Sequence, residues 1–301
     1  MRTRLIAHEL ERPQQPNAGD ITDYVNLTKP RVVLLQLLVA FATMILAANG
    51  MPPAPLLAFT LIGGGLATAS SNAFNCFFDR DLDVLMERTR GRPLPSGRIT
   101  PSAALLFGAA IGTAGLIILG LFVNVVAAAL AAAAIGYYVL VYTLWLKRRT
   151  QWSAVIGSGA GAFTPLIAWA AVTGGVGWAP VLLFLIIVLW TMPHFWSLII
   201  FRRDDYESAG IRAPSSAVIN ASIIGCVCAL PAVCTVLAPV AHLGPIYLAV
   251  SACLGLPYIV LALRLVGSEA ARPARQLFYY SLIYLVFLLG GIIVDKALTH
   301  L

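Results

Sequence analysis

Three side chains with amide or carboxylate oxygens recur every four residues in a short charged stretch of an otherwise apolar chain. They are Asn75, Asp79 and Asp83. On a helix that continued past residue 77, this spacing would place all three on one face within about two turns, with Asp81 pointing nearly the opposite way. Two carboxylates on one face repel each other unless a cation lies between them. Because oxygen ligands suit Mg²⁺, and Mn²⁺ as well, the spacing predicts a metal site at Asp79 and Asp83; a solvated loop of balanced charge is the alternative.

Four arginines follow within residues 88–98, among glycine and proline residues that resist helix formation and let the segment fold back over a site. Guanidinium groups form bidentate hydrogen bonds with phosphate oxygens. A metal-binding pair beside these arginines predicts a diphosphate substrate, although arginine-rich loops also arise from membrane topology alone.

The elements that must position these residues are membrane helices. Hydrophobic residues make up 59% of the chain and charged residues 11%, whereas a soluble domain has about 25% charged residues. A transmembrane helix needs about 20 mostly apolar residues. We therefore predict an all-α integral membrane protein. Nine segments fit, at 31–50, 54–77, 102–121, 123–145, 153–173, 178–201, 216–239, 245–265 and 277–295.

Basic residues predict the orientation of these helices in the lipid bilayer. With a cytoplasmic N-terminus, 19 of the 20 Lys and Arg residues fall on the inner side and only Lys296 lies outside. The net charge of +7 is then explained by topology, without a nucleic-acid partner. Residues 1–28 are acidic and lack an apolar core, unlike a signal or transit peptide. We expect a bacterial plasma (inner) membrane, a polar cytoplasmic segment at 1–28, one membrane domain at 29–301 and an outside C-terminus.

A second polar cluster ends the sixth predicted span. His194 lies inside the span, about two turns from the charged run 202–205. A histidine in a membrane helix is either a hydrogen-bond partner for a neighbouring helix or a functional group. We predict that both charged clusters converge on one cavity.

Three long motifs resemble one enzyme family over about residues 20–295. They read NCFFDRDLDVLMERTRGRPLPSGRI, YTLWLKRRTQWSAVIGSGAGAFTPLIAWAAVTG and MPHFWSLIIFRRDDYESAGI. They resemble the protoheme IX farnesyltransferases, the heme branch of the intramembrane aromatic prenyltransferases. The resemblance implies nine helices around a central cavity open to the cytoplasmic side, where two Asp-rich motifs hold Mg²⁺ and an isoprenyl diphosphate.

The first of these motifs falls on Asn75, Asp79 and Asp83, and the second departs from the superfamily. Positions 202 and 206, where the superfamily has acids, are Arg202 and Tyr206. The acids available there are Asp204 and Asp205, in a pattern that resembles the heme branch. By this resemblance the metal ligands are Asp79, Asp83, Asp204 and Asp205, and the diphosphate is neutralised by Arg88, Arg92, Lys147 and Arg148. The heme contacts are His194, Arg202, Arg203 and Tyr206.

The implied reaction joins farnesyl diphosphate to protoheme IX (heme b), which is a substrate. A farnesyl cation would be attacked by a heme vinyl group, and water would capture the product cation. Apolar walls would protect the first cation from water. The alternatives are prenylation of a quinone precursor and secondary transport, which would place polar groups near the bilayer midplane. Binding of a heme A synthase is left open.

Overall fold

The structure is a computed structural model that describes residues 19–146, 149–150, 153–208, 210, 214–266, 268 and 270–298; the side chains of 153–156 and 158 lie outside the description. Helices account for almost all of this part of the chain. In chain order they are α2 (Ile21–Leu27), α3 (Pro30–Ala48), α4 (Ala54–Phe78), α5 (Arg80–Leu85), α6 (Pro101–Phe122), α7 (Val125–Gly136), the π-helix η1 (Tyr137–Leu146), α8 (Ser153–Thr173), α9 (Trp178–Phe201), α10 (Arg203–Ser208), α11 (Ser216–Val240), α12 (Pro245–Val266) and α13 (Ala271–Leu298).

Each of the nine predicted membrane segments coincides with a long helix. Within the described residues, eight helices are long and apolar enough to cross a membrane, the fourth being α7 continued by η1. The remaining predicted segment coincides with α8. Its apolar part, Gly159–Thr173, is shorter than the eight candidate membrane helices. The predicted all-α, multi-pass membrane architecture is confirmed.

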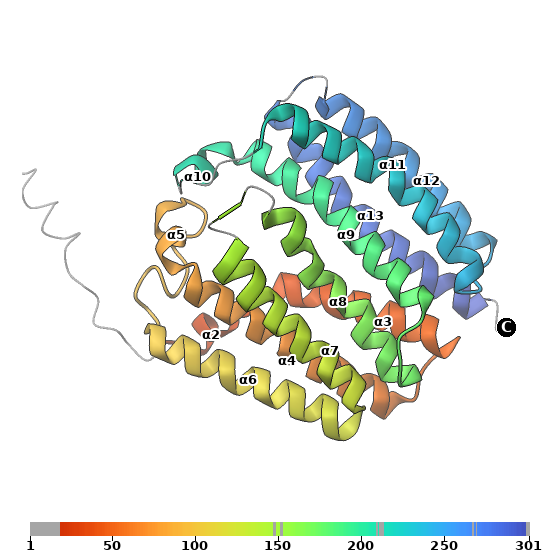
Figure 1. Ribbon diagram of the computed structural model, residues 1–301, viewed down its shortest axis with the longest axis horizontal. Coiled ribbons are helices and arrows are strands. Elements are labelled where there is room, and N and C mark those ends of the chain that lie inside the picture. Colours follow the sequence, from red (N-terminus) through yellow and green to blue (C-terminus); the bar gives the residue numbers. More distant parts are fainter. Residues whose placement is uncertain are drawn as a thin grey trace, which may run out of the picture.

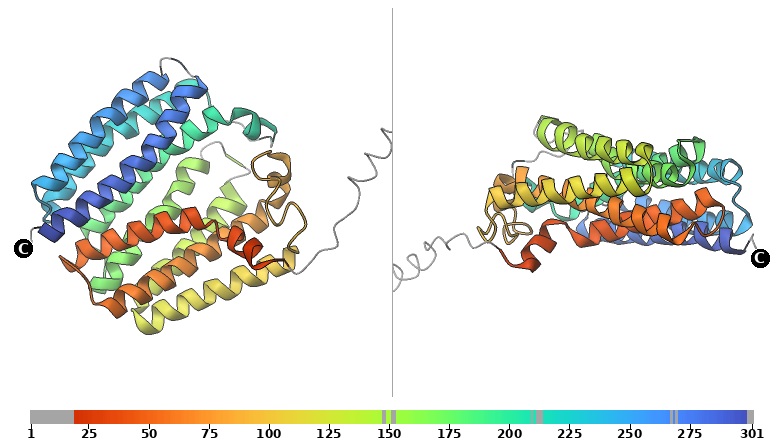
Figure 2. Two further views of the ribbon diagram at one scale, coloured as in Figure 1. Left: turned by 180° about the vertical axis from the view of Figure 1, so that it is seen from behind. Right: turned by 90° about the horizontal axis from the view of Figure 1, so that it is seen from below.

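The long helices lie side by side in a closed arrangement (Figure 1). α3 contacts α4, α8 and α13, while α9 contacts α8, α11 and α13, so the first and last membrane helices are neighbours. Seen from below, α7 and α8 lie on one side and α3 and α4 on the other (Figure 2). This arrangement brings helices from both halves of the chain around a shared interior.

Glycine residues allow α4 and α6 to approach each other closely. A Cβ atom added to Gly115 would lie 2.7 Å from the carbonyl oxygen of Gly63. Ser70 Oγ donates a hydrogen bond of 2.7 Å to the carbonyl oxygen of Gly108. Small residues and hydroxyl groups of this kind join helices inside membranes, where lipid is as apolar as the protein interior. They fix α4, which carries the predicted metal ligands at its end.

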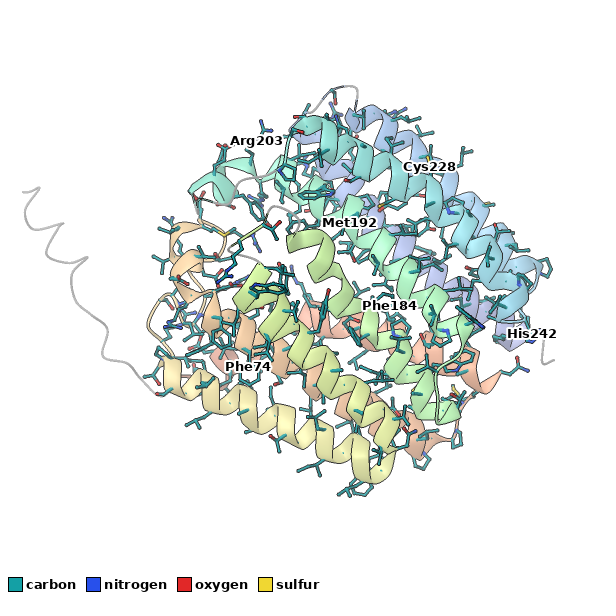
Figure 3. All side chains as sticks on the ribbon, viewed as in Figure 1. Phe74, Phe184, Met192, Arg203, Cys228 and His242 are labelled. Carbon is teal, nitrogen blue, oxygen red and sulfur yellow. The ribbon has the colours of Figure 1, made fainter. Side chains whose placement is uncertain are left out.

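Polar groups gather at both ends of the bundle. α5 and α10 lie at one end, and the C-terminus lies at the other (Figure 1). Arg203 and His242 mark these two ends in Figure 3. At the second end, buried Lys296 donates hydrogen bonds of 2.8 Å to Asn49 Oδ1 and to the carbonyl oxygen of His242. Lys296 is the one basic residue that the predicted topology places on the outer side. It lies at the end of the bundle opposite to the charged clusters.

The short helix α2 belongs to the packed structure. It lies within the predicted polar segment 1–28, of which residues 19–28 are described. Leu27 is fully buried, and the carboxylate of Asp23 accepts a hydrogen bond of 2.9 Å from Arg98 Nε. Asn72 Nδ2 donates to the carbonyl oxygen of Thr28 at 2.9 Å. These contacts join α2 to α4 and to the segment that precedes α6.

Candidate active site

The helix carrying the first acidic motif breaks within the motif. α4 ends at Phe78, Asp79 has φ −93° and ψ 1°, and α5 begins at Arg80. The condition of one continuous helix through Asp83 is therefore not met, because a break at Asp79 separates α4 from α5. The backbone N–H of Asp83 still bonds to the carbonyl oxygen of Asp79 at 2.8 Å, which keeps the pitch nearly helical. Asn75, Asp79 and Asp83 are all buried, whereas Asp81 is exposed.

We call Asn75, Asp79 and Asp83 the carboxylate cluster. Asn75 lies at its centre. Its Oδ1 accepts a hydrogen bond of 2.6 Å from Lys29 Nζ. Its Nδ2 donates to Asp79 Oδ2 at 2.6 Å and to Thr143 Oγ1 at 3.4 Å. Because Lys29 has only donors, it fixes which side of the amide faces Asp79. One amide thus joins α4, the start of α3 and the π-helix η1.

Asp83 is held by an arginine of the segment that follows α5. Arg92 Nη1 donates to Asp83 Oδ1 at 3.0 Å and to Oδ2 at 2.8 Å. Thr89 Oγ1 donates to the carbonyl oxygen of Asp83 at 2.9 Å, so this segment does fold back over the cluster. A charge-assisted pair of this kind is strong. The chain's own guanidinium therefore lies against one predicted metal ligand.

The donor atoms of the carboxylate cluster fit a magnesium ion. Amide and carboxylate oxygens are hard ligands, and Mg²⁺ usually takes one or two carboxylates and completes its shell with water and phosphate. No group of three His, Cys, Asp or Glu side chains that could hold a metal occurs in the described part of the chain. Acidic side chains alone do not complete a site, and Asn75 Oδ1 already accepts a hydrogen bond from Lys29. Water and a substrate phosphate would supply the other ligands.

The second charged segment contacts the first, while the convergence of both clusters on one cavity stays a prediction. Asp205 Oδ1 accepts a hydrogen bond of 3.0 Å from the backbone N–H of Glu87. Ser208 Oγ donates to the carbonyl oxygen of Leu85 at 3.0 Å. The ribbons of α5 and α10 accordingly lie next to each other in Figure 1. Clusters from two different parts of the sequence thus share one end of the bundle.

The other residues predicted for this segment lie outside the cavity described below. Arg202, Arg203 and Asp204 are exposed. Arg202 stacks over the Phe201 ring at 5.2 Å, and Arg203 Nε lies 3.8 Å from Glu207 Oε1. Tyr206 is buried, with its ring 6.3 Å from that of Phe195.

The arginine and lysine predictions for the diphosphate have three outcomes. Arg92 contacts the carboxylate cluster. Arg88 is exposed and has no ion pair within the described part of the chain. Lys147 and Arg148 lie outside the described residues.

A cavity of about 590 Å³ lies among α3, α4, α7, η1, α8, α9 and α13. Asn72, one helical turn before Asn75, lines it, so the cavity begins close to the carboxylate cluster. Its walls are mainly aliphatic and aromatic, with a few polar side chains such as Gln36 and Thr164, which share a hydrogen bond of 2.6 Å. Arg31 is the one charged side chain among the described residues that line it. The cavity suits a large apolar substrate that carries a few polar groups.

His194 lies in the wall of this cavity between two aromatic rings. Its ring centroid is 4.8 Å from that of Trp190 and 4.5 Å from that of Phe278, with interplanar angles of 19° and 26°. His194 Nδ1 lies 2.7 Å from Ser281 Oγ. His194 therefore joins α9 to α13, as the packing alternative expects, and it also lines the cavity, so its contact with heme stays a prediction.

Sequence reasoning missed three contributors to the site. Lys29 is only one of the 19 basic residues that predict the orientation, and Thr143 is only one residue of the second quoted motif. Ser281 had no signal at all, because it is 87 residues from His194. The one clue to the aromatic pair was Trp190, which precedes His194 by one helical turn.

Fold and site together define a membrane-embedded enzyme with an enclosed apolar cavity and an acidic cluster at one end. The sequence profile of the UbiA prenyltransferase family matches residues 36–288. The chain belongs to this family and is a prenyltransferase.

Its relatives include named enzymes of one kind. The protoheme IX farnesyltransferase of Gloeobacter violaceus is 45% identical over 292 residues, which is 95% of each chain. The protoheme IX farnesyltransferase of Synechococcus elongatus is 44% identical over 295 residues, which is 95% of this chain and 92% of that one.

Solved structures share the fold at low identity. A digeranylgeranylglyceryl phosphate synthase matches with a TM-score of 0.76 and 18% identity, over 92% of this chain and 98% of that one. A UbiA homologue from Archaeoglobus fulgidus bound to GPP and Mg²⁺ matches with a TM-score of 0.61 and 18% identity, over 90% of this chain and 99% of that one.

Proposed function

We propose that this prenyltransferase moves the farnesyl group of farnesyl diphosphate to a vinyl group of protoheme IX, with addition of water, to give heme O and diphosphate. The observation that carries the proposal is the carboxylate cluster at one end of an apolar cavity of about 590 Å³ whose wall contains His194. The protoheme IX farnesyltransferases at 45% and 44% identity support the same acceptor.

The carboxylate cluster binds the diphosphate end of the donor through a divalent ion. Asp79 and Asp83 are the proposed metal ligands, and the GPP and Mg²⁺ bound to the Archaeoglobus fulgidus homologue support this assignment. When bound, Mg²⁺ supplies charge neutralisation for the departing diphosphate. Lys29 and Arg92 already lie on the cluster and add positive charge. Asp204, Asp205, Arg88, Lys147 and Arg148 stay predicted ligands of metal or diphosphate.

Bond making then takes place in the apolar part of the cavity. The allylic carbon–oxygen bond breaks and its electron pair leaves with the diphosphate. The terminal vinyl carbon of the heme bonds to the allylic carbon, and one water molecule adds to the cation that remains on the vinyl group and releases a proton. The apolar walls exclude other water, which would capture the first cation too early. No nucleophile of the protein takes part.

The heme would lie beside His194, deeper in the bundle than the diphosphate. His194 lies seven residues before the end of α9 at Phe201, a rise of about 10 Å along the axis of this helix. Arg31 lines the cavity and has no ion pair within the described residues. The propionate carboxylates of protoheme provide a matching negative charge. Arg202, Arg203 and Tyr206 stay predicted heme contacts, outside the lining of this cavity.

The charged end of the bundle faces the cytoplasm in our proposal, with the protein in a bacterial plasma membrane. The distribution of 19 of 20 basic residues on that side supports it. A labelling reagent that cannot cross the membrane tests the orientation through cysteines introduced at exposed Arg88 and at His242. A heme A synthase, which would use the product, stays a predicted partner.

The decisive experiment uses purified protein in detergent with farnesyl diphosphate and reduced protoheme. We expect a pigment whose mass increases by one farnesyl group and one hydroxyl, together with released diphosphate. Prenylation of a quinone precursor in place of heme would contradict the acceptor. Binding of farnesyl diphosphate with no consumption in the presence of either acceptor would instead favour a transporter.

A further inference from the structure

Ser281 makes three hydrogen bonds where α9 and α13 meet. Its carbonyl oxygen accepts a bond of 2.6 Å from Trp190 Nε1. Its hydroxyl lies 2.7 Å from His194 Nδ1 and donates a bond of 2.6 Å to the carbonyl oxygen of Phe278. Ser281 is completely buried. One small residue thus contacts the histidine and both aromatic residues that enclose it.

The hydrogen bonds at Ser281 favour one tautomer of His194. The contact between Ser281 Oγ and His194 Nδ1 fits either direction on its own. When the single hydrogen of the serine hydroxyl is donated to the carbonyl oxygen of Phe278, Oγ is an acceptor toward His194 and Nδ1 is the donor. In a neutral imidazole a protonated Nδ1 leaves Nε2 with its lone pair. The hydrogen-bond network therefore selects one tautomer.

The two aromatic rings fix the direction of that lone pair. Trp190 and Phe278 stack on opposite sides of the imidazole, at 4.8 Å and 4.5 Å. Trp190 is itself anchored to Ser281 through its indole N–H. His194, Trp190 and Phe278 all line the cavity, and Nδ1 is the ring nitrogen that Ser281 contacts. In the Nδ1–H tautomer, Nε2 is the nitrogen with a lone pair for a ligand bound in this cavity.

We propose that Ser281 is a positioning residue, which holds His194 as the Nδ1–H tautomer so that Nε2 binds the iron of the heme acceptor. This inference rests on the proposed function. A histidine that ligates a metal usually donates its other ring N–H to a fixed partner, which orients the ring and increases its basicity. Ser281 supplies that partner from a neighbouring helix.

The test separates iron ligation from simple helix packing by using two porphyrins. Wild-type protein, Ser281→Ala and Ser281→Thr are titrated in detergent with protoheme, followed by visible absorption, and with metal-free protoporphyrin IX, followed by fluorescence. We expect Ser281→Ala to weaken protoheme binding by about 10-fold to 100-fold, the usual effect of losing such a partner, and to change the heme spectrum. Binding of metal-free porphyrin should stay within about twofold, because it forms no bond to Nε2.

The variants also test the packing explanation. Ser281→Thr keeps the hydroxyl and should recover the wild-type heme spectrum. Ser251→Ala, at a buried serine of α12 outside the cavity lining, is the matched control and should leave both porphyrin affinities unchanged. If Ser281→Ala weakens both porphyrins equally, Ser281 only joins α9 to α13. If its heme spectrum and affinity equal those of the wild type, Ser281 does not position the iron ligand.

Turnover of the wild-type protein keeps this inference distinct from the proposed function. Product formation by wild type together with an unaltered heme spectrum in Ser281→Ala would overturn the inference alone. If the heme spectrum changes in Ser281→Ala but the wild-type protein forms no farnesylated product, only the proposed function is overturned. Failure of wild-type protein to bind protoheme would overturn both.

Discussion

Lys29 Nζ donates a hydrogen bond of 2.6 Å to Asn75 Oδ1, across 46 residues of sequence. Lys29 adopts a left-handed backbone conformation, with φ 53°, immediately before Pro30 begins α3. The first membrane helix therefore starts with its lysine directed at the amide that contacts Asp79. A cation held there favours the negative charge of a bound diphosphate.

Replacing Lys29 with Met should lower turnover by about tenfold or more. A hydrogen bond to a charged group contributes about 1.5–3 kcal/mol, and about 1.4 kcal/mol corresponds to a factor of ten in rate. Initial rates over a range of farnesyl diphosphate concentrations give the measurement. Arg264→Gln, at an exposed site on α12, is the control for lost charge. Equal rates for Lys29→Met and wild type would remove Lys29 from the site.

Replacing Asp79 with Asn should lower turnover by about 10²-fold to 10³-fold, the usual effect of removing one electrostatic contact with developing charge. Asn keeps the size of the buried side chain and removes its charge. Mass analysis of the extracted pigment measures the product. Asp81→Asn is the matched control, because Asp81 is exposed and lies two residues further along the chain, on α5. Similar losses in both variants would mean that general charge, and not the carboxylate cluster, supports the reaction.

Chelation should stop the reaction without releasing the heme. Carboxylate oxygens and a diphosphate suit Mg²⁺ or Mn²⁺, whereas the proposed contacts of the heme need no added metal. The experiment adds EDTA, measures turnover and the visible spectrum of bound heme, and then restores Mg²⁺ in excess. Full turnover in metal-free buffer would show that Lys29 and the arginines neutralise the diphosphate on their own.

Replacing Arg31 with Ala should weaken binding of protoheme by about tenfold but leave its dimethyl ester unaffected. The ester has no free carboxylates, so only protoheme can lose a charge-assisted contact of about 1.5–3 kcal/mol. Spectroscopic titration of both pigments provides the comparison, with Arg272→Ala at an exposed site of α13 as the control. An equal effect on protoheme and ester would contradict a propionate contact.

Replacing Gly115 with Ala should destabilise the bundle. The new Cβ would lie 2.7 Å from the Gly63 carbonyl oxygen and 3.0 Å from the Ala67 nitrogen, both of them backbone atoms. Overpacking of this kind costs about 1–3 kcal/mol. Gly120→Ala on the same helix is the control, because its Cβ would meet only Ala128 Cβ at 3.8 Å. A thermal unfolding midpoint lowered in Gly115→Ala but not in Gly120→Ala is the expected result, and equal midpoints would contradict it.

The sequence by itself determined the membrane helices and the residues of the first acidic motif. A segment of apolar residues long enough to cross the bilayer must form a helix there, because only a helix satisfies its own backbone hydrogen bonds in lipid. The spacing of Asn75, Asp79 and Asp83 predicted that the three side chains lie together on one face, and all three are buried, even though α4 ends at Phe78 and α5 is a separate short helix. The local pattern was sufficient for this prediction, because the four-residue spacing keeps the three side chains close together across the short break between α4 and α5.

Only the tertiary structure decided which distant residues meet. The partners Lys29 and Asn75, Glu87 and Asp205, and His194 and Ser281 are 46, 118 and 87 residues apart. The physical reason is that lipid is as apolar as the interior of the bundle, so hydropathy hardly distinguishes the face of a helix that turns inward from the face that meets lipid. The rotation of α9 and α13 about their axes, set by packing against neighbours, is what places the Ser281 hydroxyl against the His194 ring.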